Sequence, residues 1–546
     1  MMLSCYDQYC DTAKRYSEKD FLHIPLSAVQ SYSDRAVNYT YQNGLDATEE
    51  LIRVYTSVGI IGSTRIGLML DNRAEFFLHF LALNALGCSI VPIHAQYTDE
   101  EMQYLVAHSG LKLFVCLAEY EERVSRLCEE VDISILVANT ETLSQLKPLQ
   151  NTLKKSERNL DLEAAILYTS GTTGKPKGCV LSNRYFLSWG NWYREMEGAA
   201  NLRLGQERLA TPLPTNHQNA MACSFMGMVS TGGCVIQLDR FHSSTWWDTI
   251  RASNATIIHY LGVMPAMLMN MPVSAQDDFG EQLRFGLGAG VDPKHHAAFE
   301  ARFGFPLVEG WAMTETGGTA CIMASLEPRN VGTRCIGKPP GTLDFKLVDE
   351  HGQEVDSGEP GELLVKTRGD DPRQNFFVEY LKNPEATAEA WDGGYFHTGD
   401  VVRVDNDGYM YFVDRRKNVI RRSGENISAV EVEAALLQQD LVHSCAVTSV
   451  EDEFRGEEVL AIIKLEDQID ASVQTAEKVI TNSRQSLAYF KVPGHVIFVQ
   501  ELPVGSTQKV KRGEIKELRD ELLNTPSHFN LCHLKKSKSL GSTSGS

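Results

Sequence analysis

The sequence has little positive charge for its length. Its 546 residues include 52 Lys and Arg against 71 Asp and Glu, which gives a net charge of −19 at pH 7. A surface this acidic argues against non-specific binding to nucleic acid or to anionic membranes. We therefore expect no nucleic-acid partner, and any site for an anionic ligand needs local positive charge.

The sequence also lacks the cysteine patterns of disulfide-rich or zinc-binding proteins. Its 12 cysteines lie scattered, with no Cys-x-x-Cys pair and no Cys/His cluster at zinc spacing. Such thiols are typical of a reducing compartment, so we expect a cytoplasmic protein. The adjacent His295 and His296 are predicted to lie on the surface rather than to bind a metal.

No stretch reads as a signal peptide or a membrane span. The N-terminus, residues 1–21, mixes Tyr, Asp, Lys and Glu and has no apolar core of signal-peptide length. Two charge-free segments, 76–98 and 209–238, are interrupted by Gly and Pro and carry His or Asn inside. We expect buried helix-then-strand units there, and no integral membrane segment.

The length exceeds what one hydrophobic core usually supports, so two or more domains are expected. Helical and strand periodicities alternate over 39–117 and again over 209–260. This alternation predicts an α/β fold with doubly wound, largely parallel sheets. Thr98 and Glu101 form a capping box that predicts a helix start, and Ser428 with Glu431 predicts another.

The texture changes twice further along the chain. Short strands separated by Gly, Pro and Asp predict a β-rich subdomain over about 332–413, which completes a large N-terminal domain, 1–413. A new pattern of helices and strands then predicts a smaller, mobile α+β domain over 414–526. The Lys, Ser and Gly content of 527–546 predicts a disordered tail.

One stretch, Tyr168–Gly178, organises the rest of the chain. It follows an apolar run, Ala164–Leu167, and combines three glycines with Ser and Thr hydroxyls and the charge of Lys177. Backbone N–H groups that turn inward beside such donors suit a polyphosphate. The common Gly-x-x-x-x-Gly-Lys-Ser/Thr loop does not fit it in any register, which indicates a different nucleotide chemistry. A simple surface turn between two strands is the alternative.

Other polar or Gly-rich turns fall at predicted strand ends. Since ligands bind at the carboxyl ends of parallel strands, we expect these turns to face one cleft. A dinucleotide site at Gly286-x-Gly288-x-x-Val291 is excluded, because the third glycine and an acidic partner for ribose are missing. The turns are those at His217, at Gly262, at 286–290 and at 309–316.

These motifs resemble those of the acyl-adenylate-forming, or AMP-binding, superfamily, which includes acyl-CoA synthetases, luciferases and adenylation domains. The loop at Tyr168–Gly178 is similar to the family's signature loop, and four further motifs follow in the family's order over nearly the whole globular chain. Over the stretch 239–266 the sequence most resembles bacterial crotonobetaine/carnitine-CoA ligases. The four further motifs are Trp311–Glu315, Tyr395–Asp400, Asp414–Lys417 and Ser506–Lys509.

The resemblance implies an ATP-dependent, AMP-forming acid–CoA ligase with ATP, Mg²⁺ and CoA as cofactors. A carboxylate would attack the α-phosphate of ATP to give an acyl-adenylate, and a thiol would then displace AMP. A stand-alone enzyme that loads a carrier protein, a non-catalytic nucleotide-binding scaffold and a luciferase-like oxygenase remain open. Nothing in the sequence indicates a homo-oligomer.

The resemblance also implies roles for particular residues at the nucleotide. The loop would hold the β- and γ-phosphates, Glu315 would bind Mg²⁺, Trp311 would face adenine, and Asp400 with Arg415 would hold the ribose. The expected ATP or AMP contacts are Thr169, Ser170, Gly171, Thr172, Thr173, Gly174, Lys177, Gly288, Ala289, Gly290, Glu309, Gly310, Trp311, Thr314, Asp400 and Arg415.

Lys509 is expected to be the catalytic lysine of adenylation, and Lys417 the hinge between the two half-reactions. A solvated surface lysine is the competing interpretation of Lys509. Ala312 and Gln508 depart from the family, which usually has Gly at both positions. The residues expected on the CoA side are Arg421 and Gly424, with Arg422, Arg455 and Lys491 as further candidates for its phosphates.

His217 is expected to act in catalysis as a gate between the acyl pocket and the thiol, although a satisfied core histidine is the alternative. The turn Thr215–Gln218 has no Asp of the kind that binds a substrate ammonium, which favours a plain carboxylic acid over an α-amino acid. Carnitine-like betaines, other small polar acids and medium acyl chains remain open. The expected pocket residues are His217, Asn219, Val263, Met264 and Gly317.

Overall fold

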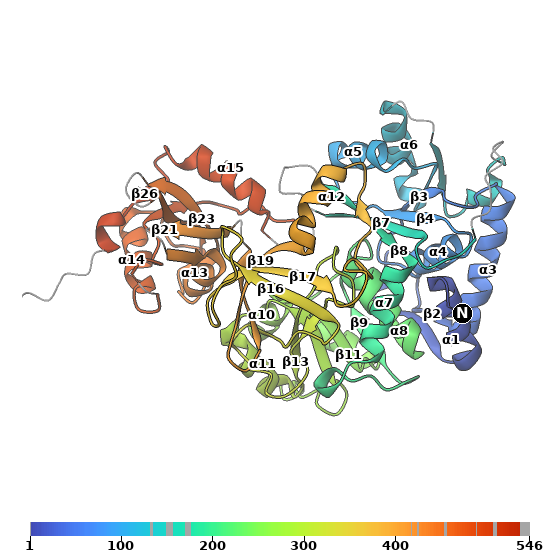
Figure 1. The fold of residues 1–546 in the computed structure, drawn as a ribbon, viewed down its shortest axis with the longest axis horizontal. Helices are drawn as coiled ribbons and strands as arrows, with labels where there is room; N and C mark the ends of the chain where they lie inside the picture. Colours follow the sequence, from blue (N-terminus) through green and yellow to red (C-terminus); the bar gives the residue numbers. More distant parts are fainter. Residues whose placement is uncertain are drawn as a thin grey trace, which may run out of the picture. The chain divides into compact units, whose positions relative to one another are not determined.

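The computed structural model describes residues 2–131, 135–148, 157–169, 176–415, 418–422, 425–452, 456–487, 489–505 and 510–535. The chain divides into two compact units. The first contains Met1–Lys346, Leu364–Thr398 and Asp405–Tyr411; the second contains Leu347–Leu363, Gly399–Val404 and Phe412–Ser546. In Figure 1 the segment from Phe412 onward is drawn in orange to red.

The first unit contains an eight-stranded sheet of order β14-β13-β12-β11-β9-β10-β1-β2. Strands β10, β9, β11, β12 and β13 run parallel, so their carboxyl ends meet at one edge. The strands are β1 (Asp20–Ile24), β2 (Val37–Thr40), β9 (Arg208–Thr211), β10 (Cys234–Gln237), β11 (Ile257–Leu261), β12 (Phe285–Ala289), β13 (Leu307–Trp311) and β14 (Ile322–Met323).

A seven-stranded sheet of order β18-β8-β7-β4-β3-β5-β6 also belongs to the first unit. Its parallel part is joined at one side to an antiparallel pair, β7 and β8, which flank the predicted phosphate loop. The strands are β3 (Arg65–Met69), β4 (Ser89–Pro92), β5 (Leu113–Cys116), β6 (Leu136–Asn139), β7 (Glu163–Thr169), β8 (Lys177–Ser182) and β18 (Glu379–Tyr380).

A layer of helices touches both sheets. Helix α4 contacts β4 of one sheet and β1 of the other, and ten of its 12 residues are buried. This burial explains the charge-free segment in the sequence. The helices of this unit are α1 (Cys5–Tyr16), α2 (Leu26–Val29), α3 (Tyr41–Ser57), α4 (Ala74–Ala85), α5 (Asp99–Ser109), α6 (Glu121–Glu130), α7 (Asn183–Arg194), α8 (Phe225–Thr231), α9 (Trp246–Ala252), α10 (Val263–Met269), α11 (Pro293–Phe303) and α12 (Pro384–Ala390).

Several predicted local features are present. The capping box at Thr98 and Glu101 opens α5, with both reciprocal bonds formed. A β-rich part is also present as a five-stranded sheet of order β15-β20-β19-β17-β16. Its strands are β15 (Cys335–Gly337), β16 (Leu343–Val348), β17 (Gly361–Thr367), β19 (Phe396–Val404) and β20 (Met410–Arg415).

The second unit has its own sheet and its own hydrophobic core. Ser428 caps α13 as predicted, but the Glu431 carboxylate bonds Lys491 at 2.6 and 2.8 Å, so the reciprocal half of that capping box is wrong. The elements are β21 (Val419–Arg422), β22 (Glu425–Ser428), α13 (Ala429–Leu436), β23 (Val442–Asp452), β24 (Gly456–Leu465), α14 (Val473–Ser483), β25 (His495–Phe498), α15 (Arg512–Leu522) and β26 (His528–Asn530).

The prediction of a disordered tail is wrong for its first part. Strand β26 pairs antiparallel with β25, and a short 3₁₀ helix, Cys532–Lys535, follows it. Leu531 is buried in the core of the second unit, where Phe529 and Leu534 pack against it. Three apolar side chains therefore anchor this segment. Residues 536–546 lie outside the described part of the chain.

Among the described residues, no helix combines the length and the apolar content that a membrane crossing requires.

Candidate active site

The carboxyl ends of β11 and β12 approach each other closely. The Gly262 N–H donates to the Ala289 carbonyl at 3.0 Å, and a Cβ on Gly262 would lie 1.8 Å from the carbonyl oxygen of Gly290. Gly290 itself has a φ of +82°. Both positions therefore need glycine. Ala289 and Gly290 are exposed, so this turn presents its backbone at the sheet edge, as the sequence predicts for an adenine-binding wall.

The neighbouring strand β13 carries the predicted aromatic motif to the same edge. It pairs parallel with β12 and ends at Trp311, which is buried. Gly310 is tightly packed, because a Cβ there would lie 2.5 Å from the methyl carbon of Met323. Ala312, where the family usually has Gly, does not have a positive φ. An alanine is therefore compatible with this backbone.

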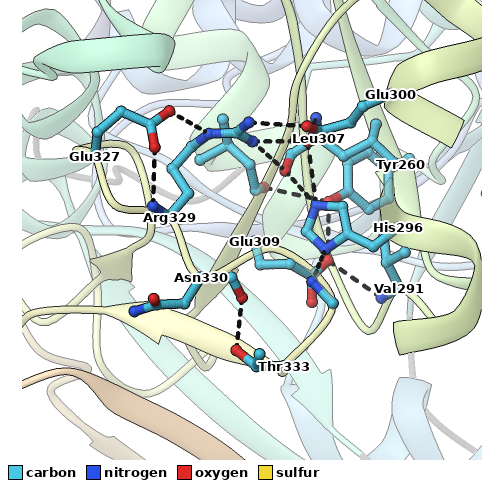
Figure 2. Close-up of polar contacts among 12 residues, drawn as sticks. Tyr260, Val291, His296, Glu300, Leu307, Glu309, Glu327, Arg329, Asn330 and Thr333 are labelled. Atoms are coloured by element: carbon cyan, nitrogen blue, oxygen red, sulfur yellow. Dashed lines mark hydrogen bonds and ion pairs between the residues drawn. The ribbon is translucent and has the colours of Figure 1, made fainter. Parts of the chain in front are cut away.

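Glu309 lies behind the turn that follows β12 (Figure 2). It is 5% exposed, and its carboxylate accepts from the N–H groups of Gly290 at 3.0 Å and Val291 at 3.2 Å. The Tyr260 hydroxyl donates to the same carboxylate at 2.9 Å. Burial raises the pKa of Glu309, and these three donors oppose that rise. All three hydrogen bonds join it to groups of the protein.

His296 contributes to the second layer of this region. The sequence predicts this residue on the surface, which is wrong: it is buried, and its Nε2 lies 2.9 Å from the Leu307 carbonyl. The Gly332 N–H donates to its Nδ1 at 3.2 Å. Helix α11 turns this side chain inward against the start of β13, a placement that the His-His pair does not reveal.

The predicted phosphate side of the site lies where β7 and β8 meet. Thr169 and Lys177 face each other as paired residues at the two ends of the loop. The Lys177 ammonium lies 4.8 Å from the ring centre of Tyr380, whose hydroxyl donates to Glu315 at 3.0 Å. One tyrosine thus links the predicted phosphate lysine to the predicted metal ligand. Ser170, Gly171, Thr172, Thr173 and Gly174 lie outside the described residues.

Sequence reasoning missed Tyr380. It lies on β18, which pairs with β8 about 200 residues away, opposite Cys179. Burial and the Glu315 carboxylate raise the pKa of the Tyr380 hydroxyl, and the same two causes raise the pKa of the Cys179 thiol. Both groups are therefore neutral at pH 7.

The donor set fits Mg²⁺ better than a cage-bound metal. In the part of the chain that the structure describes, no group of three or more His, Cys, Asp and Glu side chains could hold a metal ion. Mg²⁺ is commonly held by one or two carboxylates together with substrate phosphates. Glu315, buried and oriented by Tyr380, suits that mode. Thr314, next to it, is half-buried at the same turn.

The second unit brings the two predicted ribose residues together. Asp400, on β19, is buried, and the Arg415 guanidinium at the end of β20 forms an ion pair with it, with Nε 3.0 Å from Oδ1. The carboxylate is thereby held while the arginine stays half-exposed. The resemblance predicts that both residues hold the ribose.

The turn that carries His217 is fixed by a residue that sequence reasoning missed. Asn72, which follows β3 of the other sheet, accepts from the Thr215 N–H at 2.9 Å and donates to the carbonyls of Leu213 at 3.2 Å and Leu238 at 3.0 Å. His217 is exposed beyond this turn, so the alternative of a core histidine is wrong.

Asn219 is anchored to a buried histidine. It begins a π-helical turn, η4 (Asn219–Ser224), and its Oδ1 lies 2.9 Å from the Nδ1 of His259 on β11. Tyr193 holds the other ring nitrogen at 3.0 Å. Complete burial lowers the pKa of His259 to about 3, so the ring is neutral. The carbonyl end of Asn219 therefore faces the protein.

The remaining pocket candidates differ in exposure. Val263 opens α10 and is 38% exposed, whereas Met264 is buried in the hydrophobic core of this sheet. Gly317 has a φ of +64° and packs against the Asn375 carbonyl, 2.1 Å from where a Cβ would lie. Val263 is thus available to a ligand, and Gly317 meets a backbone requirement.

The expected CoA residues are only partly described. Arg422, a further candidate, is buried and bonds Glu458 at 2.8 Å, and Lys491 bonds Glu431. Both therefore serve ion pairs within the second unit instead of an exposed phosphate site. Lys417, Gly424, Arg455 and Lys509, the side chain of Arg421, and the departure at Gln508 lie outside the description.

Two profiles of known families match the chain. The AMP-binding enzyme family matches residues 11–369, and the AMP-binding enzyme C-terminal domain matches residues 431–509. The chain therefore belongs to the AMP-binding enzyme family. This result confirms the family predicted from the motifs and, with it, the class of enzyme, an AMP-forming acid–thiol ligase.

Similar curated proteins include the crotonobetaine/carnitine–CoA ligase of Citrobacter koseri, 29% identical over 93% of this chain and 97% of the relative. The enzyme of the same name from an Escherichia coli O45:K1 strain is 28% identical over 88% and 93%. The chain thus spans nearly the full length of these relatives.

Solved structures share the fold. ATP-bound MatB from Rhodopseudomonas palustris has a TM-score of 0.78 and 22% identity, covering 95% of this chain and 99% of that one. The o-succinylbenzoate CoA synthetase of Bacillus subtilis with its acyl-adenylate intermediate has a TM-score of 0.77 and 22% identity, covering 93% and 97%. The predicted fold class, with a large N-terminal and a smaller C-terminal domain, is confirmed.

Proposed function

We propose that this protein activates a carboxylic acid with ATP and transfers the acyl group to CoA. In the first step a carboxylate oxygen bonds the α-phosphorus and the bond to pyrophosphate breaks. In the second step the CoA sulfur bonds the acyl carbon, the bond to AMP breaks and the thiol proton is released. The observation that carries the proposal is the contact series Lys177–Tyr380–Glu315 beside the loop between β7 and β8.

Each residue has one task in the first step. Lys177 supplies positive charge to the leaving pyrophosphate, and Glu315, which Tyr380 orients, would hold Mg²⁺. When bound, Mg²⁺ offsets the negative charge that pyrophosphate carries away. Lys509 stabilises the charge that gathers at the α-phosphate, an electrostatic role whose loss typically costs about 10²- to 10³-fold in rate.

Other residues bind and orient the nucleotide and then change the reaction. Trp311 and the turn at 288–290 bind adenine, and Asp400 with Arg415 binds the ribose hydroxyls.

Lys417 acts as the hinge that exchanges Lys509 for the CoA-binding face. His217 acts as the gate between acid and thiol. Arg421 and Gly424 line the CoA side.

The acid is a plain carboxylic acid, and a small polar acid or a betaine is the class we favour. The turn Thr215–Gln218 has no carboxylate for a substrate ammonium, which disfavours α-amino acids. The curated relatives act, by name, on crotonobetaine and carnitine. A cytoplasmic location is supported by the 12 cysteines, which all lie in the described part of the chain and are all free thiols.

The proposal is tested by pyrophosphate release across a panel of crotonobetaine, carnitine, other small polar acids and medium-chain acids. Each active acid is then offered CoA or a phosphopantetheinylated carrier protein, and the thioester is measured by mass spectrometry. We expect release with at least one acid and a thioester with CoA. A thioester formed only on the carrier protein would overturn the CoA assignment, and no release with any acid would favour a scaffold.

The variant Lys509→Ala separates the two steps in the same assay. It should lose adenylation by about 10²- to 10³-fold but should still transfer the acyl group from a supplied acyl-adenylate to CoA. Lys417→Pro should do the reverse and accumulate the acyl-adenylate. Equal loss of both steps in either variant would contradict these separate roles.

A further inference from the structure

We propose that Glu309 is a positioning residue that fixes the adenine-binding turn from behind without touching the nucleotide. The inference rests on the proposed function, because it assumes that the exposed backbone at Ala289 and Gly290 receives adenine. The family resemblance predicts Glu309 as one of the nucleotide contacts. The geometry points to a different role, in which the carboxylate shapes the protein wall.

Three donors surround the Glu309 carboxylate, and two of them come from the turn. A carboxylate can only accept, and this one receives the N–H groups of Gly290 and Val291 on separate oxygens, at 3.0 and 3.2 Å. Tyr260, on the neighbouring strand β11, adds its hydroxyl at 2.9 Å. Figure 2 shows Tyr260 and Val291 converging on Glu309 from different sides. The turn is thus held by two adjacent amides at once.

The two amides belong to a sharply turned stretch of backbone. The positive φ of Gly290 turns the chain sharply after β12, and Gly290 N–H and Val291 N–H lie on the inner side of that turn. A buried N–H group without an acceptor costs about 1–3 kcal/mol. Glu309 satisfies both amides, so it stabilises the conformation in which Ala289 and Gly290 stay exposed.

The nearby cation, Arg329, bonds another carboxylate. The Arg329 guanidinium bonds Glu300 through two parallel contacts, at 2.7 and 2.8 Å (Figure 2). Glu300 also accepts from the Leu307 N–H at the start of β13, at 2.9 Å. This ion pair anchors the strand, and the hydrogen bonds to Glu309 come from Tyr260 and the two turn amides. Glu309 is therefore bonded directly to the turn, whereas Glu300 is not.

Glu309→Gln is the sharpest test, because glutamine keeps the shape but replaces one acceptor oxygen with an NH₂ donor. One turn amide then faces another donor, and the turn must rearrange. We expect the Kd for AMP and the KM for ATP to rise about tenfold, the equivalent of losing one hydrogen bond to a charged group. The KM for the acid and kcat should stay within about twofold.

The experiment measures AMP and GMP binding by calorimetry, with ATP kinetics and melting temperature alongside, in the wild-type chain and in matched variants. Glu300→Gln is the control: it should lower the melting temperature but leave AMP affinity and the AMP-to-GMP ratio unchanged. Glu309→Gln should reduce that ratio. Should it fail to fold, Tyr260→Phe removes one donor and should raise the KM for ATP about two- to threefold.

The outcomes are separable. Wild-type protein that does not bind AMP overturns the proposed function and the inference with it. Wild-type protein that binds AMP, with unchanged affinity and base preference in Glu309→Gln, overturns the inference alone. Equal losses of AMP affinity in Glu309→Gln and Glu300→Gln also overturn it, because a general loss of stability would then explain both.

Discussion

Two buried carboxylates, one in each unit, are stabilised in opposite ways. Glu309 in the first unit accepts hydrogen bonds from a tyrosine and two backbone amides. Glu458 in the second unit is fully buried and bonds the Arg422 guanidinium at 2.8 Å and the Lys535 ammonium. One carboxylate is held by uncharged donors, two amides of one turn and a tyrosine of strand β11, and the other by two cations from distant parts of the chain.

The difference shows what each carboxylate does for the fold. Buried ion pairs gain little net free energy, because desolvation offsets most of the attraction, but removing one partner is costly. Glu458 therefore specifies which segments meet, strand β21 and the 3₁₀ helix at 532–535, more than it adds stability. Glu309 instead determines the conformation of one turn, as suits a wall that receives a ligand.

Glu458→Ala should have the largest effect, because it leaves two buried cations without their counter-charge. We expect a loss of about 3–5 kcal/mol in the free energy of unfolding of the second unit. Urea denaturation with hydrogen exchange on β24 and β25 measures it. The matched control is Glu466→Ala, whose pair with His443 is exposed and should be worth less than about 1 kcal/mol. Equal losses in the two variants would erase the contrast.

Lys535→Met tests the same cluster from its C-terminal end. Methionine keeps an apolar stem in a site where the lysine is 3% exposed, and Arg422 still pairs with Glu458. Burial lowers the pKa of Lys535, although Glu458 opposes the shift. We expect a loss of about 1–3 kcal/mol, with faster hydrogen exchange in β26.

Lys464→Met is the control for that variant, because its partner Glu501 is exposed. It should cost less than about 1 kcal/mol. If Lys535→Met were neutral and β26 kept its protection, the 3₁₀ helix would be held by its apolar residues alone.

Tyr260→Phe sharpens the other side of the comparison. It removes the hydroxyl donor to Glu309 while both turn amides stay in place, so we expect a loss of about 1–2 kcal/mol in unfolding free energy. The control is Tyr9→Phe, because the Tyr9 hydroxyl is also buried but donates to an uncharged carbonyl, that of Tyr41, at 2.8 Å. A larger loss for Tyr9→Phe would mean that the carboxylate gives Tyr260 no special strength.

Much of the fold follows from local patterns in the sequence. The capping box at Thr98, the buried segment around α4 and the strand before Tyr168 all depend on residues within one element. The family motifs predicted the nucleotide residues, of which Thr169, Ala289 and Trp311 lie at strand ends. The same motifs predicted Asp400 and Arg415 at the ribose, and the structure shows that the two form an ion pair.

The contacts that were missed join distant parts of the chain. Tyr380 reaches Glu315 because β18 pairs with β8, and Asn72 fixes the turn of His217 from the other sheet. Neither tyrosine nor asparagine carries a local signal for such a role. The tail was misjudged because its Lys and Ser content was averaged with three apolar residues that anchor it. Sequence periodicity predicts a helix or a strand, but it does not predict which distant residues that element will contact.

The smallest expected effect separates Glu309 from its neighbour Glu300 by the sign of their pH dependence. Burial raises the pKa of Glu309, so the pH-dependent part of its effect on stability is favourable below its ordinary pKa and is lost as the pH rises through the shifted value. For Glu300, burial is outweighed by Arg329, His296 and the Leu307 N–H, which lower the pKa to about 2. Its contribution is present above pH 4.5 and is lost as the pH falls.

The unfolding free energies of the wild type and of Glu300→Gln, measured at pH 7 and pH 4, test this sign. The wild type binds fewer protons at Glu300 than the unfolded chain does, so its advantage over the variant should shrink by about 0.8 kcal/mol at pH 4. The difference in unfolding free energy between Glu309→Gln and the wild type should not shrink on acidification in this way. The reason is that the pKa of Glu309 is shifted upward, whereas that of Glu300 is shifted downward. A wild-type advantage over Glu300→Gln that grows on acidification would contradict the assignment of Arg329 to Glu300.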